Sequence, residues 1–230
     1  DSGGNLYGVS WGGATTVQRI DIASGTVTTL AGSIILGAPA DGTGAAARFR
    51  DLAGIVADNN GNLFVSDFSD HTDRKIVIAT GVVSTLAGSL GQAGSRDGVG
   101  GDARFFEPAG ITIDGAGNLF VAEFGSHVIR RIVIATGAVT TLAGTVGVWG
   151  GKDGIGTDAQ LSSPWGVVAD GAGHLYVADA GNKAVRRIAI ASGQVTTVAG
   201  TLGEKGHRDG LGAAARFVDP RGVALDDQGL

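Results

Sequence analysis

The sequence predicts an all-β chain, and three observations lead to this fold class: the glycine content, an internal repeat and a series of short apolar runs. Of the 230 residues, 42 are glycine and only 4 are proline, and no Gly-X-Y period is present. A collagen-like chain is therefore excluded. Hydrophobic residues make up 43% of the chain, which is enough for a sizeable core and argues against disorder. Glycine at this level indicates many turns, and these suit short strands better than helices.

A repeat of 56 residues runs through the whole chain. Two dipeptides recur with this step, Ala-Gly and Asp-Gly: Ala31-Gly32, Ala87-Gly88, Ala143-Gly144 and Ala199-Gly200, and Asp41-Gly42, Asp97-Gly98, Asp153-Gly154 and Asp209-Gly210. The first repeat has one additional residue, which falls between Leu6 and Ile20. We therefore expect a single domain, residues 1–230, built from four repeats with approximate bounds 1–52, 53–108, 109–164 and 165–230.

Each repeat contains four apolar runs, which we label strands A to D. In the second repeat they are Gly54–Asp58, Asn62–Asp67, Arg74–Ile78 and Val82–Ala87. The runs are rich in β-branched residues, too short for helices and bounded by turn residues. A four-stranded antiparallel unit of this kind cannot bury two apolar faces alone, whereas units stacked around an axis can. The predicted fold is therefore an all-β propeller of about four blades.

The two ends of the sequence carry complementary strands. Gly222–Asp226 has the pattern of strand A, whereas Asn5–Val9 has the pattern of strand B and no strand A precedes it. Pairing the two would complete a fourth blade and cover an exposed strand edge, an arrangement called velcro closure. The alternatives are that the chain is part of a larger ring, or that several chains together form one propeller.

The repeat resembles the NHL repeat over essentially the whole chain. The resemblance is carried by Glu107–Asp114, Gly117–Glu123 and Val139–Gly144 in the third repeat, and by Asp219–Asp226 at the end. The first repeat departs from the pattern, and Leu52 replaces the proline found at positions 108, 164 and 220. NHL propellers include protein-binding, RNA-binding and enzymatic members, so the resemblance implies a fold rather than a function. The Thr-Leu-Ala-Gly pattern of the repeats is similar to that of exported NHL proteins, and this resemblance implies an extracellular or periplasmic protein.

Composition excludes several classes of site and partner. The chain has no cysteine, which excludes disulfides and zinc or iron–sulfur sites with cysteine ligands. Its formal net charge is −5, and its basic residues are spread through the repeats, so we expect no binding to nucleic acid. It has no apolar run long enough to span a membrane, and we expect no membrane insertion.

The B–C and D–A connections share one face of a propeller, and this face is the predicted binding surface. Aromatic and basic residues of these connections and of the rim of the central pore are the candidate binding residues: Trp165, Arg221, Phe68, Phe124, Trp149, His71 and His127. Trp165 and Arg221 occupy equivalent positions before the glycine of strand A, and we expect them to form a contact pair. His71 and His127 are also equivalent, and either stabilise turns or converge on a metal.

A non-catalytic scaffold for binding or assembly is the function that these observations favour, with no cofactor and no metal. The residues expected at the pore rim include no carboxylate: Ala53, Ala109, Trp165 and Arg221. Expected partners are a protein or another copy of the chain. The alternative is a metal-dependent lyase or lactonase-like enzyme with a site at the central pore. The repeated Asp-Gly motifs are interpreted as turns closed by the aspartate rather than as calcium loops. We expect the aspartate to pair with the nearby Arg48, Arg104 or Arg216.

Overall fold

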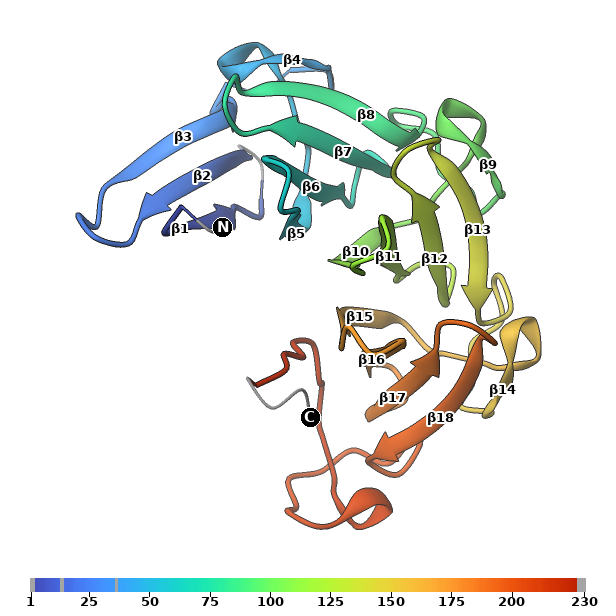
Figure 1. Ribbon diagram of the computed structural model, residues 1–230. Helices are drawn as coiled ribbons and strands as arrows, with labels where there is room; N and C mark the ends of the chain where they lie inside the picture. Colours follow the sequence, from blue (N-terminus) through green and yellow to red (C-terminus); the bar gives the residue numbers. More distant parts are fainter. Residues whose placement is uncertain (1–2, 13–14, 36, 227–230) are drawn as a thin grey trace. The chain divides into compact units, whose positions relative to one another are not determined.

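The computed structural model describes residues 3–12, 15–35 and 37–226 of the chain (Figure 1). Contacts divide the chain into two compact units. The first contains residues 1–108 and 136–138, and the second contains residues 109–135 and 139–230. None of the helices in the described ranges is long and apolar enough to cross a membrane.

The first unit contains two antiparallel sheets. The first sheet has the order β1-β2-β3, and the second has the order β4-β8-β7-β6-β5. The strands are β1 (Asn5–Val9), β2 (Thr16–Asp21), β3 (Val27–Gly32), β4 (Gly42–Thr43), β5 (Leu52–Ala57), β6 (Asn62–Asp67), β7 (Thr72–Val77), β8 (Val82–Gly88) and β9 (Gly98–Val99). Two short 3-10 helices, η1 (Gly44–Ala46) and η2 (Gly100–Asp102), lie in the D–A connections. Strands β5 to β8 are the predicted strands A to D of the second repeat.

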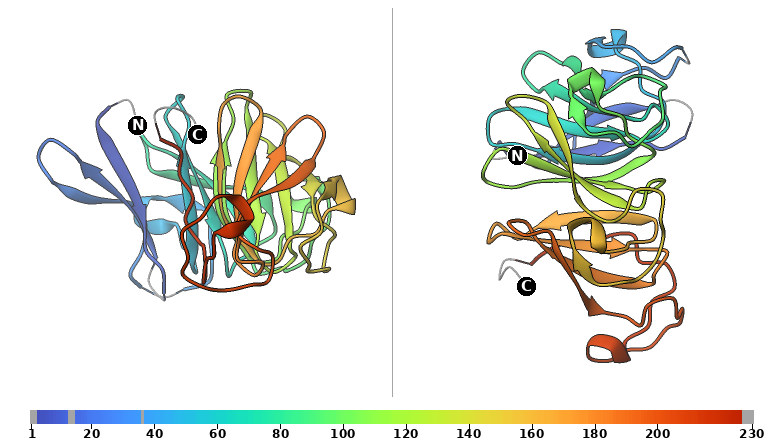
Figure 2. Two further views of the ribbon diagram at one scale, coloured as in Figure 1. Left: turned by 90° about the horizontal axis from the view of Figure 1, so that it is seen from below. Right: turned by 90° about the vertical axis from the view of Figure 1, so that its right-hand side faces the viewer.

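The second unit contains the strands of the third and fourth repeats. The strands run in the orders β10-β11-β12-β13 and β14-β18-β17-β16-β15. They are β10 (Pro108–Ile113), β11 (Asn118–Glu123), β12 (Val128–Val133), β13 (Ala138–Ala143), β14 (Gly154–Ile155), β15 (Pro164–Ala169), β16 (His174–Asp179), β17 (Ala184–Ala189) and β18 (Gln194–Ala199), with the 3-10 helices η3 (Gly156–Asp158) and η4 (Gly212–Ala214). Each sheet thus has the strand order of a propeller-type blade, and its strands are twisted (Figure 2).

The predicted all-β class with antiparallel sheets is confirmed, whereas the sheets have three or five strands rather than four, and two further differences stand out. Strand C begins earlier than expected, at Thr72 rather than Arg74, because Thr72 and Asp73 pair with the last residues of β8. Each D–A connection also adds a two-residue strand that the sequence does not reveal: β4 pairs with β8, and β14 pairs with β18.

All strand pairs described here are antiparallel, but three isolated bridges inside the D–A connections are parallel. They join Ala93 to Phe105, Trp149 to Leu161 and Lys205 to Phe217. Each bridge brings the two ends of a connection together, so that the connection folds back as a compact loop.

Each unit has its own apolar core between sheets. In the first unit the core contains Val17, Phe49, Leu52 and Val65, all at most 9% exposed. In the second unit it contains Phe120, Ile129, Leu161 and Val177, all fully buried or nearly so.

The segment Gly222–Asp226, predicted as strand A of a closing blade, has no strand assignment. The residue before it, Arg221, lies beside β15, where its carbonyl oxygen would collide with a Cβ added at Gly166. Trp165 lies in the same way beside Gly110 of β10. Glycine is therefore needed at both positions, because the backbone of the next repeat passes directly over them.

Candidate functional site

Backbone hydrogen bonds join the B–C turns of the second, third and fourth repeats to the D–A connection that begins in the same repeat. Gly91 donates to Asp70 at 3.0 Å, Gly147 to Ser126 at 3.0 Å, and Gly203 to Asn182 at 2.9 Å. We call the region where these segments meet the loop end of a sheet. It comprises residues 68–71 with 89–94 in the first unit, and residues 124–127 with 145–150 and 180–183 with 201–206 in the second.

Trp149 is the most exposed aromatic side chain at the loop end of the second unit, with 73% of its surface accessible. Its turn is held at both ends. The Val148 amide donates to the Thr145 carbonyl at 3.0 Å, and the Asn182 side chain donates to the Gly150 carbonyl at 2.6 Å. The turn is therefore a fixed platform that presents the indole to solvent.

Other apolar side chains extend the surface around Trp149. Val146 and Val148, in the same turn, are 46% and 42% exposed, and Leu202 is 38% exposed. The Leu202 side chain lies next to Gly151, where it would touch an added Cβ. Together, Val146, Val148, Trp149 and Leu202 form what we call the Trp149 patch.

Trp165 and Arg221 are brought together, as the sequence predicts, and Phe124 joins them. The Arg221 guanidinium lies 4.7 Å from the centre of the Trp165 ring, and Phe124 meets Trp165 edge-on at 5.4 Å. Arg221 is also fixed by Asp219, whose carboxylate accepts from its Nε at 2.9 Å. Cation–π and edge-to-face contacts of this kind orient the rings.

Phe68 packs against an aromatic residue that sequence analysis did not select. Trp11 meets Phe68 edge-on with ring centres 5.1 Å apart, and 55% of the Trp11 side chain remains exposed. Trp11 lies in the first repeat, which departs from the repeat pattern, so comparison between repeats gave no signal for it.

His71 and His127 both connect a B–C turn to the start of a strand A. Each adopts a left-handed backbone conformation, with φ of 57° and 64°. The Nδ1 atom of His71 accepts from the Glu107 amide at 3.3 Å, and that of His127 accepts from the Ser163 amide at 3.0 Å. Burial lowers the pKa of both imidazoles, which favours the neutral form that can accept these hydrogen bonds.

Three arginines of strand C are fully buried: Arg74, Arg130 and Arg186. Each pairs with the carboxylate that ends strand B of its own sheet. The distance is 2.7 Å from Arg186 to Asp179 and 2.8 Å from Arg130 to Glu123. Sequence analysis missed this framework, although an acid seven residues before an arginine in three repeats was a signal that could have identified it.

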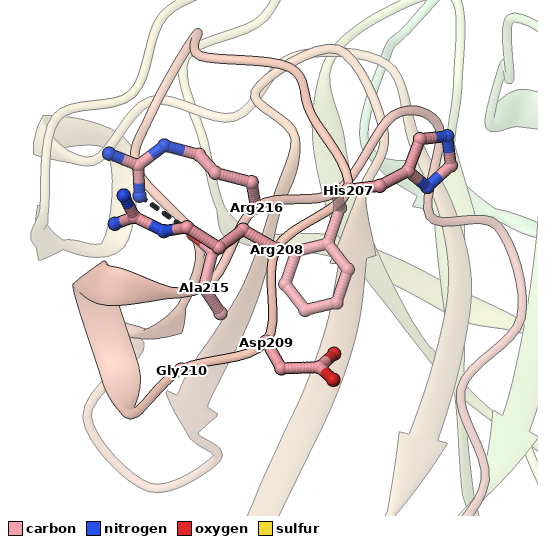
Figure 3. Close-up of a pocket in the computed structure, with 7 residues that line it drawn as sticks. His207, Arg208, Asp209, Gly210, Ala215 and Arg216 are labelled. Carbon is pink, nitrogen blue, oxygen red and sulfur yellow. Dashed lines mark hydrogen bonds between the residues drawn. The ribbon is translucent and has the colours of Figure 1, made fainter.

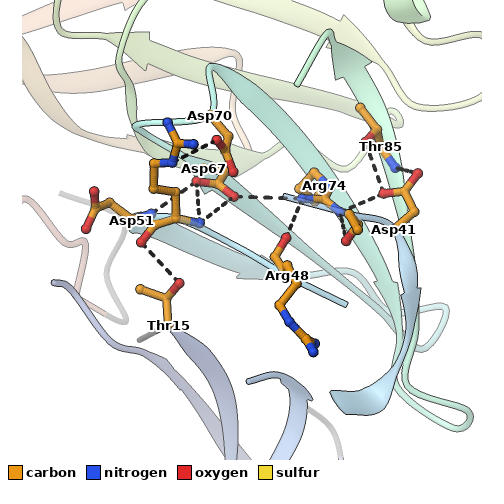
Figure 4. A network of polar contacts seen from close by, with 10 residues as sticks. Thr15, Asp41, Arg48, Asp51, Asp67, Asp70, Arg74 and Thr85 are labelled. Carbon is orange, nitrogen blue, oxygen red and sulfur yellow. Dashed lines mark hydrogen bonds and ion pairs between the residues drawn. The ribbon is translucent and has the colours of Figure 1, made fainter. Parts of the chain in front are cut away.

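The expected pairing of Asp41 with Arg48 is wrong. Asp41 accepts from Arg74 at 2.6 Å and from the Thr85 amide and hydroxyl at 3.0 Å (Figure 4). The Arg48 guanidinium instead donates to the carbonyl groups of Ala45 and Ala47. The reason is geometric: the Asp-Gly segment forms β4 along β8, so its carboxylate faces the neighbouring strands rather than its own loop.

Two buried carboxylates, Asp67 and Asp70, lie side by side at the B–C turn of the first unit (Figure 4). Asp67 accepts from the Arg50 and Asp51 amides at 3.2–3.3 Å, and Arg74 is 3.7 Å away. Burial, followed by the charge of Asp70, raises the pKa of Asp67 to about 7. Burial also raises the pKa of Asp70. Both side chains are fully covered, so this pair stabilises a turn and is closed to a substrate.

A family model described as "NHL repeat" matches residues 161–188, a segment that includes the B–C corner with Asp179 and Arg186. The chain carries the NHL repeat. The resemblance stated from the sequence is thereby confirmed, and curated relatives support it.

Among the relatives of this NHL-repeat chain is SUPPRESSOR OF QUENCHING 1, a chloroplastic protein of Arabidopsis thaliana. It is 33% identical over 138 residues, which cover 57% of this chain and 13% of that protein. The human NHL repeat-containing protein 2 is 28% identical over 166 residues, covering 68% of this chain and 23% of that protein. The matched region thus spans less than a quarter of each relative.

Solved structures share the fold of the NHL-repeat chain at low sequence identity. A protein of unknown function from Bacteroides thetaiotaomicron has a TM-score of 0.73 and 20% identity over 95% of this chain and 50% of that one. An auxiliary nutrient binding protein from Bacteroides ovatus has a TM-score of 0.63 and 21% identity over 98% of this chain and 62% of that one.

Proposed function

We propose that this NHL-repeat chain is a non-catalytic scaffold that binds a protein partner through the loop end of its sheets. The observation that carries the proposal is the Trp149 patch. Tryptophan dominates the binding energy of many protein interfaces when it enters a pocket of the partner. Because the turn is fixed by Asn182 on one side and by Thr145 on the other, little conformational entropy is lost on binding.

A second cluster, in which Phe124 of the loop end contacts Trp165, supports the same function. Trp165, Phe124 and Arg221 are residue types that interfaces concentrate, and Arg221 keeps 59% of its side-chain surface exposed. The nutrient binding protein of Bacteroides ovatus supports the proposal only as a fold on which binding occurs, since its identity to this chain is 21%.

No observation specifically favours the alternative of a metal-dependent lyase or lactonase. In the part of the chain that the structure describes, no three His, Asp or Glu side chains are grouped to hold a metal ion. The titratable groups near the loop end, such as His127 and Asp179, have backbone or arginine partners.

A peptide selection tests the proposed surface. Peptides displayed on phage and selected on the immobilised chain should bind Trp149→Ala at least about tenfold more weakly than the original chain, because a central tryptophan typically contributes about 2 kcal/mol or more. Ile155→Ala is the control, since Ile155 is 59% exposed on the outer strand β14. Equal affinity for the original chain and Trp149→Ala would contradict the proposal.

Closure of a blade by Gly222–Asp226 against β1 stays a prediction. If closure is correct, deletion of residues 219–230 should cause unfolding or aggregation. The reason is that burial of the Val223 and Leu225 side chains would stabilise the folded state by about 1.5–3 kcal/mol each. Trimming residues 1–3 should have little effect. An unchanged melting temperature and oligomeric state after the deletion would favour the alternatives, a larger ring or one built from several chains.

A further inference from the structure

A cavity of about 600 Å³ in the last D–A connection is lined by His207, Asp209, Ala215 and Phe217 and by the backbone of Arg208 and Arg216 (Figure 3). Its residues repeat, 168 positions later, a segment of the first unit whose ligand is known from the same structure: a buried arginine side chain.

The occupied copy of this segment surrounds the Arg74 guanidinium on three sides. Nη2 donates to the Asp41 carboxylate at 2.6 Å and to the Ala40 carbonyl at 2.9 Å. Nη1 donates to the Arg48 carbonyl at 3.3 Å. The Phe49 ring lies below, with its centre 5.2 Å from the guanidinium carbon. A charge-assisted hydrogen bond, two carbonyl groups and a ring thus define one guanidinium site.

A second occupied copy in the other unit shows the same arrangement. Arg186 donates to the Asp153 carboxylate at 2.7 Å and to the Gln160 carbonyl at 3.1 Å. In both copies the arginine is accompanied by a threonine. Thr85 donates twice to Asp41, and Thr197 donates twice to Asp153.

The last connection reproduces this backbone, but no arginine side chain of the described residues occupies the position that the Arg74 guanidinium takes in the first copy. Arg208 and Arg216 pair through reciprocal backbone hydrogen bonds of 3.4 and 2.9 Å, as Ala40 and Arg48 do at 3.2 and 3.0 Å. Phe217 stands at the position of Phe49, and Asp209 at the position of Asp41. Within the described residues, the Asp209 carboxylate has no hydrogen-bond or ion-pair partner.

The two arginines of the segment itself do not fill the site. Arg208 Nε donates to the Ala214 carbonyl at 2.8 Å, and Arg216 pairs with Glu204 at 2.9 Å. Figure 3 shows both guanidinium groups on the side of the segment opposite His207 and Asp209. The acidic side of the cavity therefore remains open to an arginine from elsewhere.

The occupied copies also define which structure presents that arginine. Arg74 and Thr85 are directly opposite each other on a β-hairpin, as are Arg186 and Thr197. These two arginines are fully buried in their own sites. The β12–β13 hairpin carries Arg130, which is also fully buried. The β2–β3 hairpin places Gln18 opposite Thr29, and glutamine has no guanidinium.

We propose that Asp209, Phe217 and the carbonyl groups of Arg208 and Arg216 form a guanidinium-binding site. Its ligand is the arginine of a β-hairpin in a partner sheet, where that arginine lies opposite a threonine. The hairpin would add to the segment as β7–β8 adds to β4, with the guanidinium between Asp209 and Phe217.

Titration of the isotope-labelled chain with N-acetyl-L-argininamide tests the site. We expect saturable amide shifts at Gly210 and Phe217, and about tenfold weaker binding for the citrulline analogue, which has the same shape without the charge. Asp209→Asn should weaken binding of the arginine probe to the same degree, whereas Asp158→Asn, a substitution of an exposed residue, should leave the affinity unchanged. Equal shifts with both probes, an absence of shifts, or an unchanged affinity in Asp209→Asn would overturn the proposal.

Gln18→Arg distinguishes a partner sheet from the β2–β3 hairpin. We expect this variant to keep the melting temperature and oligomeric state of the original chain, because the ligand comes from a sheet outside β1–β3. This outcome would also count against closure of Gly222–Asp226 on β1, because closure would make β2–β3 the neighbour of the last connection. If Gln18→Arg raises the melting temperature by several degrees, and Asp209→Asn cancels that gain, the β2–β3 hairpin fills the site and the assignment to a partner sheet is overturned.

Discussion

The B–C corner of the β5–β8 sheet and that of the β15–β18 sheet use the same acid and arginine with different neighbours. In the latter, Asn182 donates to Asp179 at 2.7 Å, and Arg186 approaches the same carboxylate to 2.7 Å. In the former, Asp70 stands at the position of Asn182, and Arg74 is 3.7 Å from Asp67. One corner thus has a donor where the other has a second acid.

The difference shows that a single position determines whether the buried carboxylate of the turn has a hydrogen-bond donor beside it. Asn182 donates a hydrogen bond to Asp179, and Ser126 donates one to Glu123 at 3.3 Å. Asp70 can do so only when it is protonated, because an ionised carboxylate only accepts. Neither Asp70 oxygen has a hydrogen-bond partner among the described residues, and Arg50 is 3.4 Å away with a largely exposed side chain.

Removal of the buried arginine should have the largest effect on the free energy of unfolding. The loss should be greater at the corner of the β15–β18 sheet, where arginine and acid lie closer together. Arg186→Ala leaves the buried Asp179 without its cation, which typically costs about 3–5 kcal/mol. Arg74→Ala should cost less, because Arg74 lies 3.7 Å from Asp67 whereas Arg186 lies 2.7 Å from Asp179, while burial raises the pKa of both carboxyls. Urea unfolding of the two variants at pH 6 measures both free energies. Equal losses would show that the second acid does not weaken its corner.

The Asp67 carboxyl should make stability depend on pH between about 4 and 7. Its pKa rises from 3.8 to about 7 on folding, so the folded state retains a proton that the unfolded state releases. The contribution is complete below pH 4 and is lost as the pH rises through 7. Asp67→Asn cannot titrate, so its free energy of unfolding should gain about 4 kcal/mol relative to the original chain between pH 4 and 8, since one pKa unit corresponds to about 1.4 kcal/mol. Parallel pH profiles of the two proteins would contradict this assignment.

Sequence reasoning predicted the strands where the repeat was regular, but it missed the ion pairs that join different strands. The strands, their order and the loop end follow from local patterns such as Val82–Gly88 and from the 56-residue step. The pairing of Asp41 with Arg74, 33 residues away, needed knowledge of how β4 lies along β8. Trp165 and Arg221 were matched as equivalent positions, whereas Trp11 lay in the irregular first repeat and had no equivalent for comparison.

Exchange of the second acid for the amide of the other corner should give the smallest effect, and it is stabilising. In Asp70→Asn the new amide can donate to Asp67, as Asn182 donates to Asp179. The Asp67 pKa should then fall, because the like charge beside it is gone. We expect a gain of about 1 kcal/mol at pH 8, since the exposed ion pair with Arg50 contributes little. At pH 4 the gain should be smaller, because Asp67 is then protonated in the folded original chain and no longer needs a hydrogen-bond donor beside it. Thermal unfolding at the two pH values measures this, with Asp158→Asn as the control for loss of one negative charge. If Asp70→Asn destabilises the chain at pH 8, the Asp70 carboxylate makes a favourable contact. The difference between the two corners would then not be explained by a missing hydrogen-bond donor.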